Sequence, residues 1–367
     1  MEQMMPGLDR RQFAIGLTSL PLAATLPRPA SALGDSGIHV IDMGNAPFLD
    51  REAAPSGLDG AEACTRPNND FLQTLTNLGV DTVIRYYSDR NNANLNCKNV
   101  TRRERAILAE HGLALAIVYQ FEGRRKNRYT GAQAQADAEF CLARARVIDQ
   151  PPGSTIYFGV DSDAALNSDQ GVLDYFRAVN RIFGGRYSVG IYAAGARCDL
   201  IRRAGLAQRF WVPEAPAWAG TRDFLNSGQW TLFQNKTDIN NSALTGGLGQ
   251  VLHIDTDILN PAAGNSIGAF TGDGAEKIYD PARLRAVAAA RHWVTTDRLE
   301  VHAEPGGEVV GHACIARTVH VLSQEGDWAW VDLDEDGLPD GWCRRDGLAP
   351  LDRMPRWRRT DCKLMDI

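Results

Sequence analysis

The sequence lacks the cysteine and histidine spacings that structural zinc sites use. Its seven cysteines include no C-x-x-C pair, and its seven histidines show no H-x-x-x-H spacing. A zinc site is therefore not expected. The chain also has no excess of basic residues, with 39 Lys+Arg against 45 Asp+Glu. A nucleic-acid partner, which needs a basic face, is not expected either.

Long apolar runs are absent after the N-terminal segment, so no membrane anchor is expected to remain in a mature protein. The N-terminal segment itself has the three parts of an export signal. The pair Arg10-Arg11, followed by Phe13, precedes an apolar run at 14–26 and a small-residue site at 30–32. The apolar run is shorter than the roughly 20 residues that span a bilayer. We expect export by the twin-arginine pathway to the periplasm, the cell wall or the medium. An ordinary secretory signal is the alternative.

Removal of 32 residues would leave 335, enough for two domains. The mature chain would hold 36 Lys+Arg against 43 Asp+Glu, a net charge of −7. The expected division is a signal peptide at 1–32, a barrel at 33–262, a linker at 263–290, a small β domain at 291–351 and a tail at 352–367. A monomer is expected. The sequence allows two disulfides, Cys64–Cys97 and Cys314–Cys343.

Short apolar segments alternate with helical patterns from residue 38 onward. The expected strands are 38–43, 81–87, 113–119, 155–160, 187–193, 210–212, 229–233 and 253–258. Eight strands with helical crossovers predict an α/β fold, a (β/α)8 barrel of the TIM type. A doubly wound open sheet is the alternative, but the Gly-rich dinucleotide fingerprint is missing after the first strand.

From about residue 291 the strands are short and turns are frequent, which predicts a small all-β barrel. This region resembles the bacterial SH3-like domain. The matching residues are Leu299-x-Val301-x-x-x-Pro305, Val310-Gly311, Trp328-x-x-Val331 and Gly341-Trp342 ahead of Leu348. The resemblance implies a module that binds cell-wall peptides. The alternative is an appendage that only packs on the barrel.

Function in a barrel of this type collects at the carboxyl ends of the strands. Polar and acidic residues recur at these strand ends. Glycoside hydrolases use paired carboxylates beside aromatic side chains to cleave sugars. The candidate catalytic residues are Asp42, Glu122, Asp161, Asp163 and Asp255, and the candidate substrate-binding residues are Arg85, Tyr86, Tyr119, Tyr192, Glu214 and Gln234. Taken singly, such an Asp is more often a cap or a turn residue.

The barrel resembles the DUF1906 glycoside hydrolase-like family, a relative of the family 25 glycoside hydrolases. The matching segments are Ile41-Asp42, the strands at 83–87 and 113–119, the block at 156–163, the strand at 188–192, Trp230-x-x-x-Gln234 and Ile254-Asp255. The resemblance implies a glycan-active barrel with its acid at the end of the fourth strand. Family 25 enzymes carry Asp-x-Glu there, whereas this chain has Asp161-Ser162-Asp163. The shorter Asp163 would retract the carboxyl by about 1.5 Å.

An acidic segment in the small domain is similar to a calcium loop. It carries Asp332, Asp334, Asp336 and Asp340 with Gly337 at the turn, but Cys343 stands where a bidentate Glu is expected. The alternative is an acidic hairpin turn. A calcium ion is thus an expectation for the small domain, and catalysis is expected to need no cofactor.

The expected function is hydrolysis of a β-linked amino-sugar glycan, peptidoglycan above all, at the cell envelope. Asp161 or Asp163 would be the general acid, with Glu122 as a substitute. Asp42 and Asp255 would stabilise positive charge on the sugar or orient its N-acetyl group. The alternative is a non-catalytic glycan-binding protein that has lost the acid.

Overall fold

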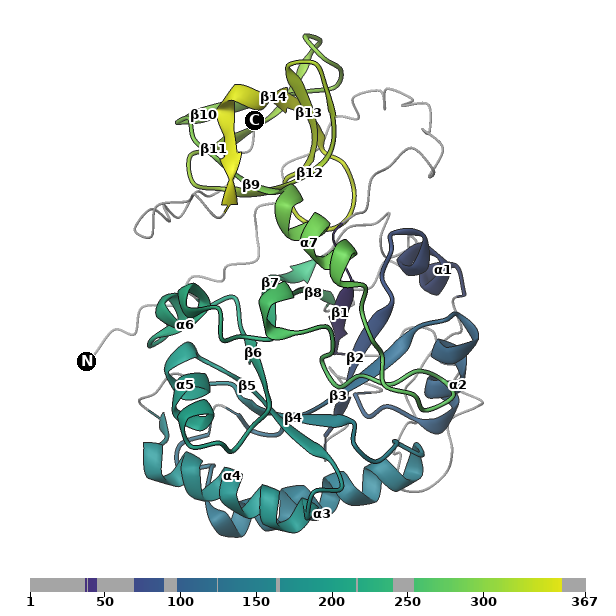
Figure 1. Cartoon of the computed structure of the whole chain (residues 1–367), viewed down its shortest axis with the longest axis vertical. Coiled ribbons are helices and arrows are strands. Elements are labelled where there is room, and N and C mark those ends of the chain that lie inside the picture. The colour runs from purple at the N-terminus through teal and green to yellow at the C-terminus, as the bar shows by residue number, and fades with distance from the viewer. Residues whose placement is uncertain are drawn as a thin grey trace, which may run out of the picture.

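The computed structural model describes residues 37, 39–44, 69–88, 98–123, 125–162, 166–215, 217–239 and 254–351. Eight strands close into a barrel in the order β1 to β8, and helices cover its outside (Figure 1). The strands are β1 (Val40–Met43), β2 (Thr82–Tyr87), β3 (Ala114–Tyr119), β4 (Thr155–Val160), β5 (Ser188–Ala193), β6 (Arg209–Val212), β7 (Leu232–Ile239) and β8 (Ile254–Leu259). The α/β barrel expected from the sequence is confirmed.

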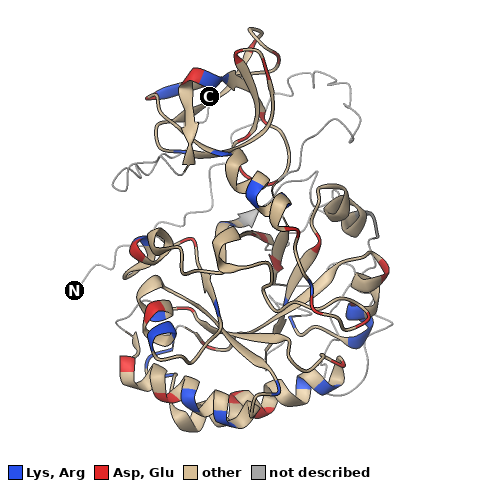
Figure 2. Ribbon diagram, in the orientation of Figure 1, with Lys and Arg blue, Asp and Glu red and all other residues tan. Residues whose placement is uncertain are grey.

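One helix follows each of the first six strands. The helices are α1 (Asn69–Asn77), α2 (Arg102–Glu110), α3 (Gly131–Val147), α4 (Asp169–Phe183), α5 (Gly195–Arg203) and α6 (Thr221–Ser227). Their ends follow from local chemistry, since Thr101 caps α2 and Gly184 ends α4 in a left-handed conformation. Acidic and basic residues are interspersed along α3 and α4 (Figure 2). Within the described residues, no helix is long and apolar enough to cross a membrane.

Strand β8 departs from the all-parallel barrel that the sequence pattern suggests. It pairs antiparallel with both β7 and β1, whereas the other neighbouring pairs of the barrel are parallel. Its amino end therefore lies beside the carboxyl end of β1, with Asp255 opposite Asp42. The reversal brings the acidic start of β8 to the mouth, the end of the barrel where β1 to β7 finish.

The barrel strands alternate between two apolar layers, as pleated strands must. One layer fills the barrel and includes Ile84, Tyr157 and Trp211, and the other packs against the helices. Gly190 is required by this packing, because a Cβ there would lie 2.5 Å from the Tyr157 ring. Large aromatic side chains thus fill the lower barrel and leave the polar groups at the mouth.

Residues 263–290, expected to be a linker, are built into the fold. Phe270 exchanges backbone hydrogen bonds of 2.9 Å with Leu115, and the Tyr157 hydroxyl donates to the Ile267 carbonyl at 2.9 Å. The Tyr279 and Thr82 hydroxyls lie 2.7 Å apart. Helix α7 (Pro281–Ala290) then leads to the second sheet. This segment therefore closes the amino-terminal end of the barrel.

The second sheet has seven strands in the order β11-β10-β14-β13-β12-β9-β15. They are β9 (Arg291–Val294), β10 (Arg298–His302), β11 (Val309–Cys314), β12 (Thr318–Glu325), β13 (Trp328–Asp332), β14 (Gly341–Arg344) and β15 (Leu348–Pro350). Cys314 is disulfide-bonded, whereas Cys343 is a free, buried thiol. The expected Cys314–Cys343 disulfide is therefore wrong. Cys64 and Cys97 lie outside the described residues.

The second sheet docks on the outer wall of β7 and β8, between which no described helix lies. Glu335, in the loop between β13 and β14, accepts a hydrogen bond from the Asn235 side chain at 2.7 Å and pairs with Arg291 at 2.8 Å. Asn235 in turn accepts from the Thr256 hydroxyl at 3.1 Å. Glu335 is only 4% exposed. The hydrogen bond from Asn235 therefore fastens the small domain to the barrel, and the ion pair with Arg291, inside the small domain, holds Glu335 in place.

We expect Glu335→Gln to destabilise the protein in a pH-dependent way. Burial opposes ionisation of Glu335, but Arg291 and neighbouring groups outweigh it and lower its pKa from 4.5 to about 2. A depressed carboxyl pKa stabilises the fold above pH 4.5, and this stabilisation is lost as the pH falls towards 2. The free energy of unfolding should thus differ from wild type by about 3 kcal/mol at pH 7, and by progressively less below pH 4.5.

Urea unfolding at several pH values measures this difference. The matched control is Glu325→Gln, a change at an exposed position on β12, and it should alter the free energy of unfolding little. A difference for Glu335→Gln that stays constant from pH 7 to pH 3 would contradict the assignment.

Candidate functional site

The mouth of the barrel holds buried carboxyl groups that face inward. Asp42, on β1, is 2% exposed and accepts a hydrogen bond from the Tyr86 hydroxyl at 2.7 Å. Its other oxygen, Oδ1, is buried without a hydrogen-bond partner. Burial raises the pKa of Asp42 to about 6, although the Tyr86 hydrogen bond and the nearby Lys98 charge act against this. Asp42 therefore changes its charge close to neutral pH.

A second polar chain crosses the mouth from β5 to β8. The Tyr192 hydroxyl donates to Gln234 Oε1 at 2.8 Å, and Gln234 Nε2 donates to Asp255 Oδ2 at 2.7 Å. The amide can serve both neighbours because it has an acceptor at one end and a donor at the other. These three predicted residues are therefore brought together and held in fixed orientations.

Asp257 lies deeper in the barrel on the same face of β8 as Asp255. It accepts a hydrogen bond from the Trp211 indole at 2.6 Å, and its Oδ2 has no partner. Burial and the charges of Asp42 and Asp255 raise its pKa well above the usual range. Asp257 was not among the candidate site residues, although its spacing of two from Asp255 predicts the shared face.

The opposite side of the mouth carries Asp161, which follows β4. Gln120 Nε2 donates to Asp161 Oδ2 at 3.4 Å, and Lys98 Nζ donates to Gln120 Oε1 at 2.9 Å. Lys98 Nζ also lies 4.2 Å from the centre of the Tyr86 ring. Lys98 was not predicted from the sequence, because the segment around it contains no recognisable motif. Asp163 lies outside the described residues.

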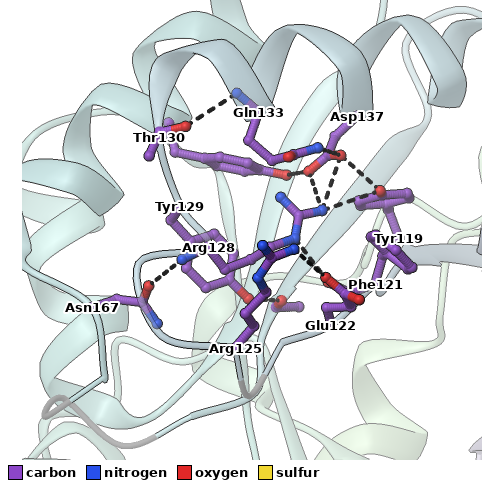
Figure 3. A network of polar contacts seen from close by, with 12 residues as sticks. Tyr119, Phe121, Glu122, Arg125, Arg128, Tyr129, Thr130, Gln133, Asp137 and Asn167 are labelled. Atoms are coloured by element: carbon purple, nitrogen blue, oxygen red, sulfur yellow. Dashed lines mark hydrogen bonds and ion pairs between the residues drawn. The ribbon is translucent and has the colours of Figure 1, made fainter.

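The rim beside Asp161 is fixed by a buried ionic network between β3 and α3. Figure 3 shows the Arg128 guanidinium directed at the Asp137 carboxylate, at 2.8 Å. The hydroxyls of Tyr119 and Tyr175 also donate to Asp137, at 2.8 and 2.6 Å. The Arg128 backbone N–H donates to Asn167 at 2.9 Å, which ties the loop after β3 to the loop after β4.

Glu122 lies in this rim and forms an ion pair with a neighbouring arginine. It has a left-handed backbone conformation, with φ of 48°, and pairs with Arg125 at 2.9 Å (Figure 3). The next residue, Gly123, packs on Asp161, since a Cβ there would lie 2.9 Å from the Asp161 Cβ. The loop therefore packs directly against Asp161, and a role of Glu122 as a substitute acid stays a prediction.

The prediction that Arg85 and Tyr119 bind substrate at the mouth is wrong. Arg85 is fully buried on the outer face of β2, where it forms an ion pair with Glu104 on α2 and a hydrogen bond to the Met43 carbonyl. Tyr119 points outward from β3 to Asp137. Both residues lie in the second half of their strands, but the strand alternation turns them to the face opposite the inward-facing Tyr86. Glu214 follows β6 and is half-buried.

The carboxylates of the acidic segment bind partners within the small domain. Asp332 accepts from the backbone N–H groups of Asp336 and Gly337 at 3.2 and 2.8 Å, and Asp340 accepts from that of Leu333. Asp334 pairs with Arg317. Among the described residues, no three His, Cys, Asp or Glu side chains are arranged to hold a metal ion. This arrangement fits the acidic hairpin turn better than a calcium loop.

One serine lies in a G-x-S-x-G string, at Gly264 to Gly268. Its hydroxyl contacts Glu276 and accepts from the Gly268 N–H at 3.0 Å. The segment follows a short 3-10 turn at Pro261–Ala263 and does not form the strand-to-helix turn that exposes a nucleophilic serine. Ser266 therefore serves the local loop.

The family model of the Rv2525c-like, glycoside hydrolase-like domain matches residues 73–259. The chain belongs to this family. The match covers β2 to β8 and thus most of the mouth described above. The glycoside hydrolase-like family expected from the sequence is confirmed.

Two curated relatives come from Bacillus subtilis (strain 168), and both are described as uncharacterized. FadG is 26% identical over 204 residues, which are 54% of this chain and 34% of FadG. YbfG is 28% identical over 174 residues, which are 44% of this chain and 24% of YbfG. The Rv2525c-like chain therefore spans about a third of the length of FadG and a quarter of that of YbfG.

The chain is also similar to solved structures, at low sequence identity. The Tat-secreted protein Rv2525c of Mycobacterium tuberculosis, solved with L-tartrate, is 18% identical, with a TM-score of 0.43 over 60% of this chain and 94% of that one. The autolysin LytC of Streptococcus pneumoniae, solved with a synthetic peptidoglycan ligand, is 13% identical, with a TM-score of 0.34 over 60% of this chain and 46% of that one.

Proposed function

We propose that this protein is an exported glycoside hydrolase that cleaves peptidoglycan or a related amino-sugar glycan. The observation that carries the proposal is the convergence of Asp42, Asp161 and Asp255 on the mouth of a barrel of the glycoside hydrolase-like family. Paired carboxylates are what glycoside hydrolysis requires, one to protonate the leaving oxygen and one to support the positive sugar.

The proposed roles follow from depth and hydrogen bonding. Asp161 is half-buried at the rim, where a leaving group could reach it, and acts as the general acid. Asp42 lies deeper and, as a carboxylate, stabilises the charge that develops at the anomeric carbon. Asp255, held by Gln234, accepts a hydrogen bond from the substrate, for example from an N-acetyl group. Tyr86 and Tyr192 border the sugar.

A role as a glycan-binding protein without hydrolysis is the second candidate. It is favoured by the sequence Asp161-Ser162-Asp163, in which an Asp stands where family 25 enzymes have the acid Glu. In that case the mouth would hold a sugar through the same carboxylates and tyrosines, and no bond would break. Binding and turnover therefore have to be measured separately.

Export and wall attachment are part of the same proposal. The Arg10-Arg11 pair with Phe13 supports delivery by the twin-arginine pathway. The small all-β domain, proposed to be SH3-like, would bind cell-wall peptides. Its contact with the barrel, the hydrogen bond between Glu335 and Asn235, would keep the wall-binding domain at a fixed position relative to the mouth.

The test incubates purified protein with insoluble peptidoglycan and follows two quantities, the protein that sediments and the reducing ends released. Hydrolysis predicts both sedimentation and release, with release lost in an Asp161→Asn/Asp163→Asn double variant. Sedimentation without release, unaffected by the double variant, supports the binding protein. Neither sedimentation nor release would overturn both candidates.

A further inference from the structure

Lys98 is an amino group set among the carboxylates of the mouth. The segment 98–100 runs beside the end of β2, where the Val100 N–H donates to the Tyr86 carbonyl at 3.0 Å and Asn99 binds the backbone of Ser88. This extra stretch of paired backbone fixes the start of the Lys98 side chain. The hydrogen bonds of the next two residues therefore hold the backbone beside Lys98 in place.

The ammonium group of Lys98 links both sides of the mouth. Towards β3 and β4 it donates to Gln120, whose amide reaches Asp161 at 3.4 Å. Towards β2 it lies over the ring of Tyr86, whose hydroxyl donates to Asp42. Its charge acts on Asp42 and Asp161 at once. A nearby cation favours the ionised form of a buried carboxylate such as Asp42.

We propose that Lys98 is a positioning residue that links Asp42 and Asp161 across the mouth and keeps Asp42 ionised. This role is useful to the protein only if the proposed function is right, but the experiment that tests it does not measure glycan hydrolysis. A buried carboxylate would otherwise take up a proton to avoid the cost of desolvation. With Lys98 in place, Asp42 can carry the negative charge that a developing sugar cation needs.

Other groups also face Asp42, and the test must leave them in place. They are Tyr86 and Arg85 from β2, Tyr192 from β5, and Asp255 and Asp257 from β8. Arg85 acts from behind the strand and is already paired with Glu104. Lys98→Met removes the ammonium charge from the inner side and changes none of these groups, whereas Lys98→Arg keeps the charge.

The experiment follows the side-chain carboxyl carbon of Asp42 by NMR as the pH is varied. In Lys98→Met the midpoint of the Asp42 titration should rise by about one pH unit or more, as expected for loss of a nearby opposite charge. In Lys98→Arg it should stay within a few tenths of a unit of wild type, an approximate bound for a retained charge. An unchanged midpoint in Lys98→Met overturns the proposal, whether or not the protein hydrolyses glycan.

A measurement on the unaltered protein covers the case in which Lys98→Met does not fold. The Lys98 Nζ nitrogen signal is followed through the titration of Asp42. The chemical shift of this nitrogen should change at the pH where Asp42 titrates, because the charges of the two groups interact. A Lys98 signal that stays flat through that range overturns the proposal.

Discussion

Replacing Asp42 by asparagine is expected to lower the rate of reducing-end release from peptidoglycan by about a hundredfold or more, the range seen when one preorganised charge-stabilising group is removed. Asparagine can still accept the Tyr86 hydrogen bond but carries no charge, so the loss reports the charge alone. The rate is measured on purified peptidoglycan at pH 7, where the wild-type carboxyl is mostly ionised because its pKa is about 6.

The dependence of the hydrolysis rate on pH provides a second test of the role of Asp42. In its proposed role Asp42 acts as a carboxylate, so wild-type activity should fall as the pH drops through about 6. The residual activity of Asp42→Asn should lack that limb. Asp174→Asn, which changes an exposed carboxylate on α4, is the control and should match wild type. Equal rates in Asp42→Asn and wild type would show that Asp42 has no role in the reaction.

Replacing Asp137 by asparagine is expected to cost about 3–5 kcal/mol in the free energy of unfolding, the range for breaking a buried ion pair at one partner. The change leaves the Arg128 guanidinium almost fully buried without its counter-charge. It also weakens the hydrogen bonds that Tyr119 and Tyr175 donate. Chemical denaturation followed by circular dichroism measures the difference.

The control for this prediction is again Asp174→Asn. Asp174 pairs with Arg177, but both side chains are about half exposed, at 48% and 53%. An exposed pair of this kind contributes about 0–1 kcal/mol. Should Asp137→Asn unfold at the same denaturant concentration as Asp174→Asn, the network between β3 and α3 does not hold the rim as described.

The barrel could be predicted from the sequence because its strands are short apolar runs with clear boundaries. The strand expected at 155–160, for example, agrees with β4, and the one expected at 81–87 differs from β2 by a single residue. The direction of β8 could not be predicted, since its apolar pattern is the same in either direction. The sequence also could not show that 263–290 packs under the barrel, because its Gly, Ala and Ser residues are equally typical of a linker.

The site was predicted in part, and the errors have one physical origin. The structure brings five of the predicted residues to the mouth: Asp42, Tyr86, Tyr192, Gln234 and Asp255. Arg85 and Tyr119 lie in the second half of their strands, but one step of the alternation turns them towards the helices. Lys98 belongs to no strand or motif, so only its contacts in three dimensions reveal it.

The most direct test of the proposed hydrolysis is product analysis after incubation of the protein with purified peptidoglycan in water enriched in heavy oxygen. Hydrolysis places one oxygen atom from water on the sugar released at the cleaved bond. We therefore predict soluble fragments whose new reducing ends carry a single heavy oxygen, formed by wild type and by Asp174→Asn but not by Asp161→Asn/Asp163→Asn. Intact glycan with no labelled reducing ends, from protein that is folded and bound to it, would contradict hydrolysis.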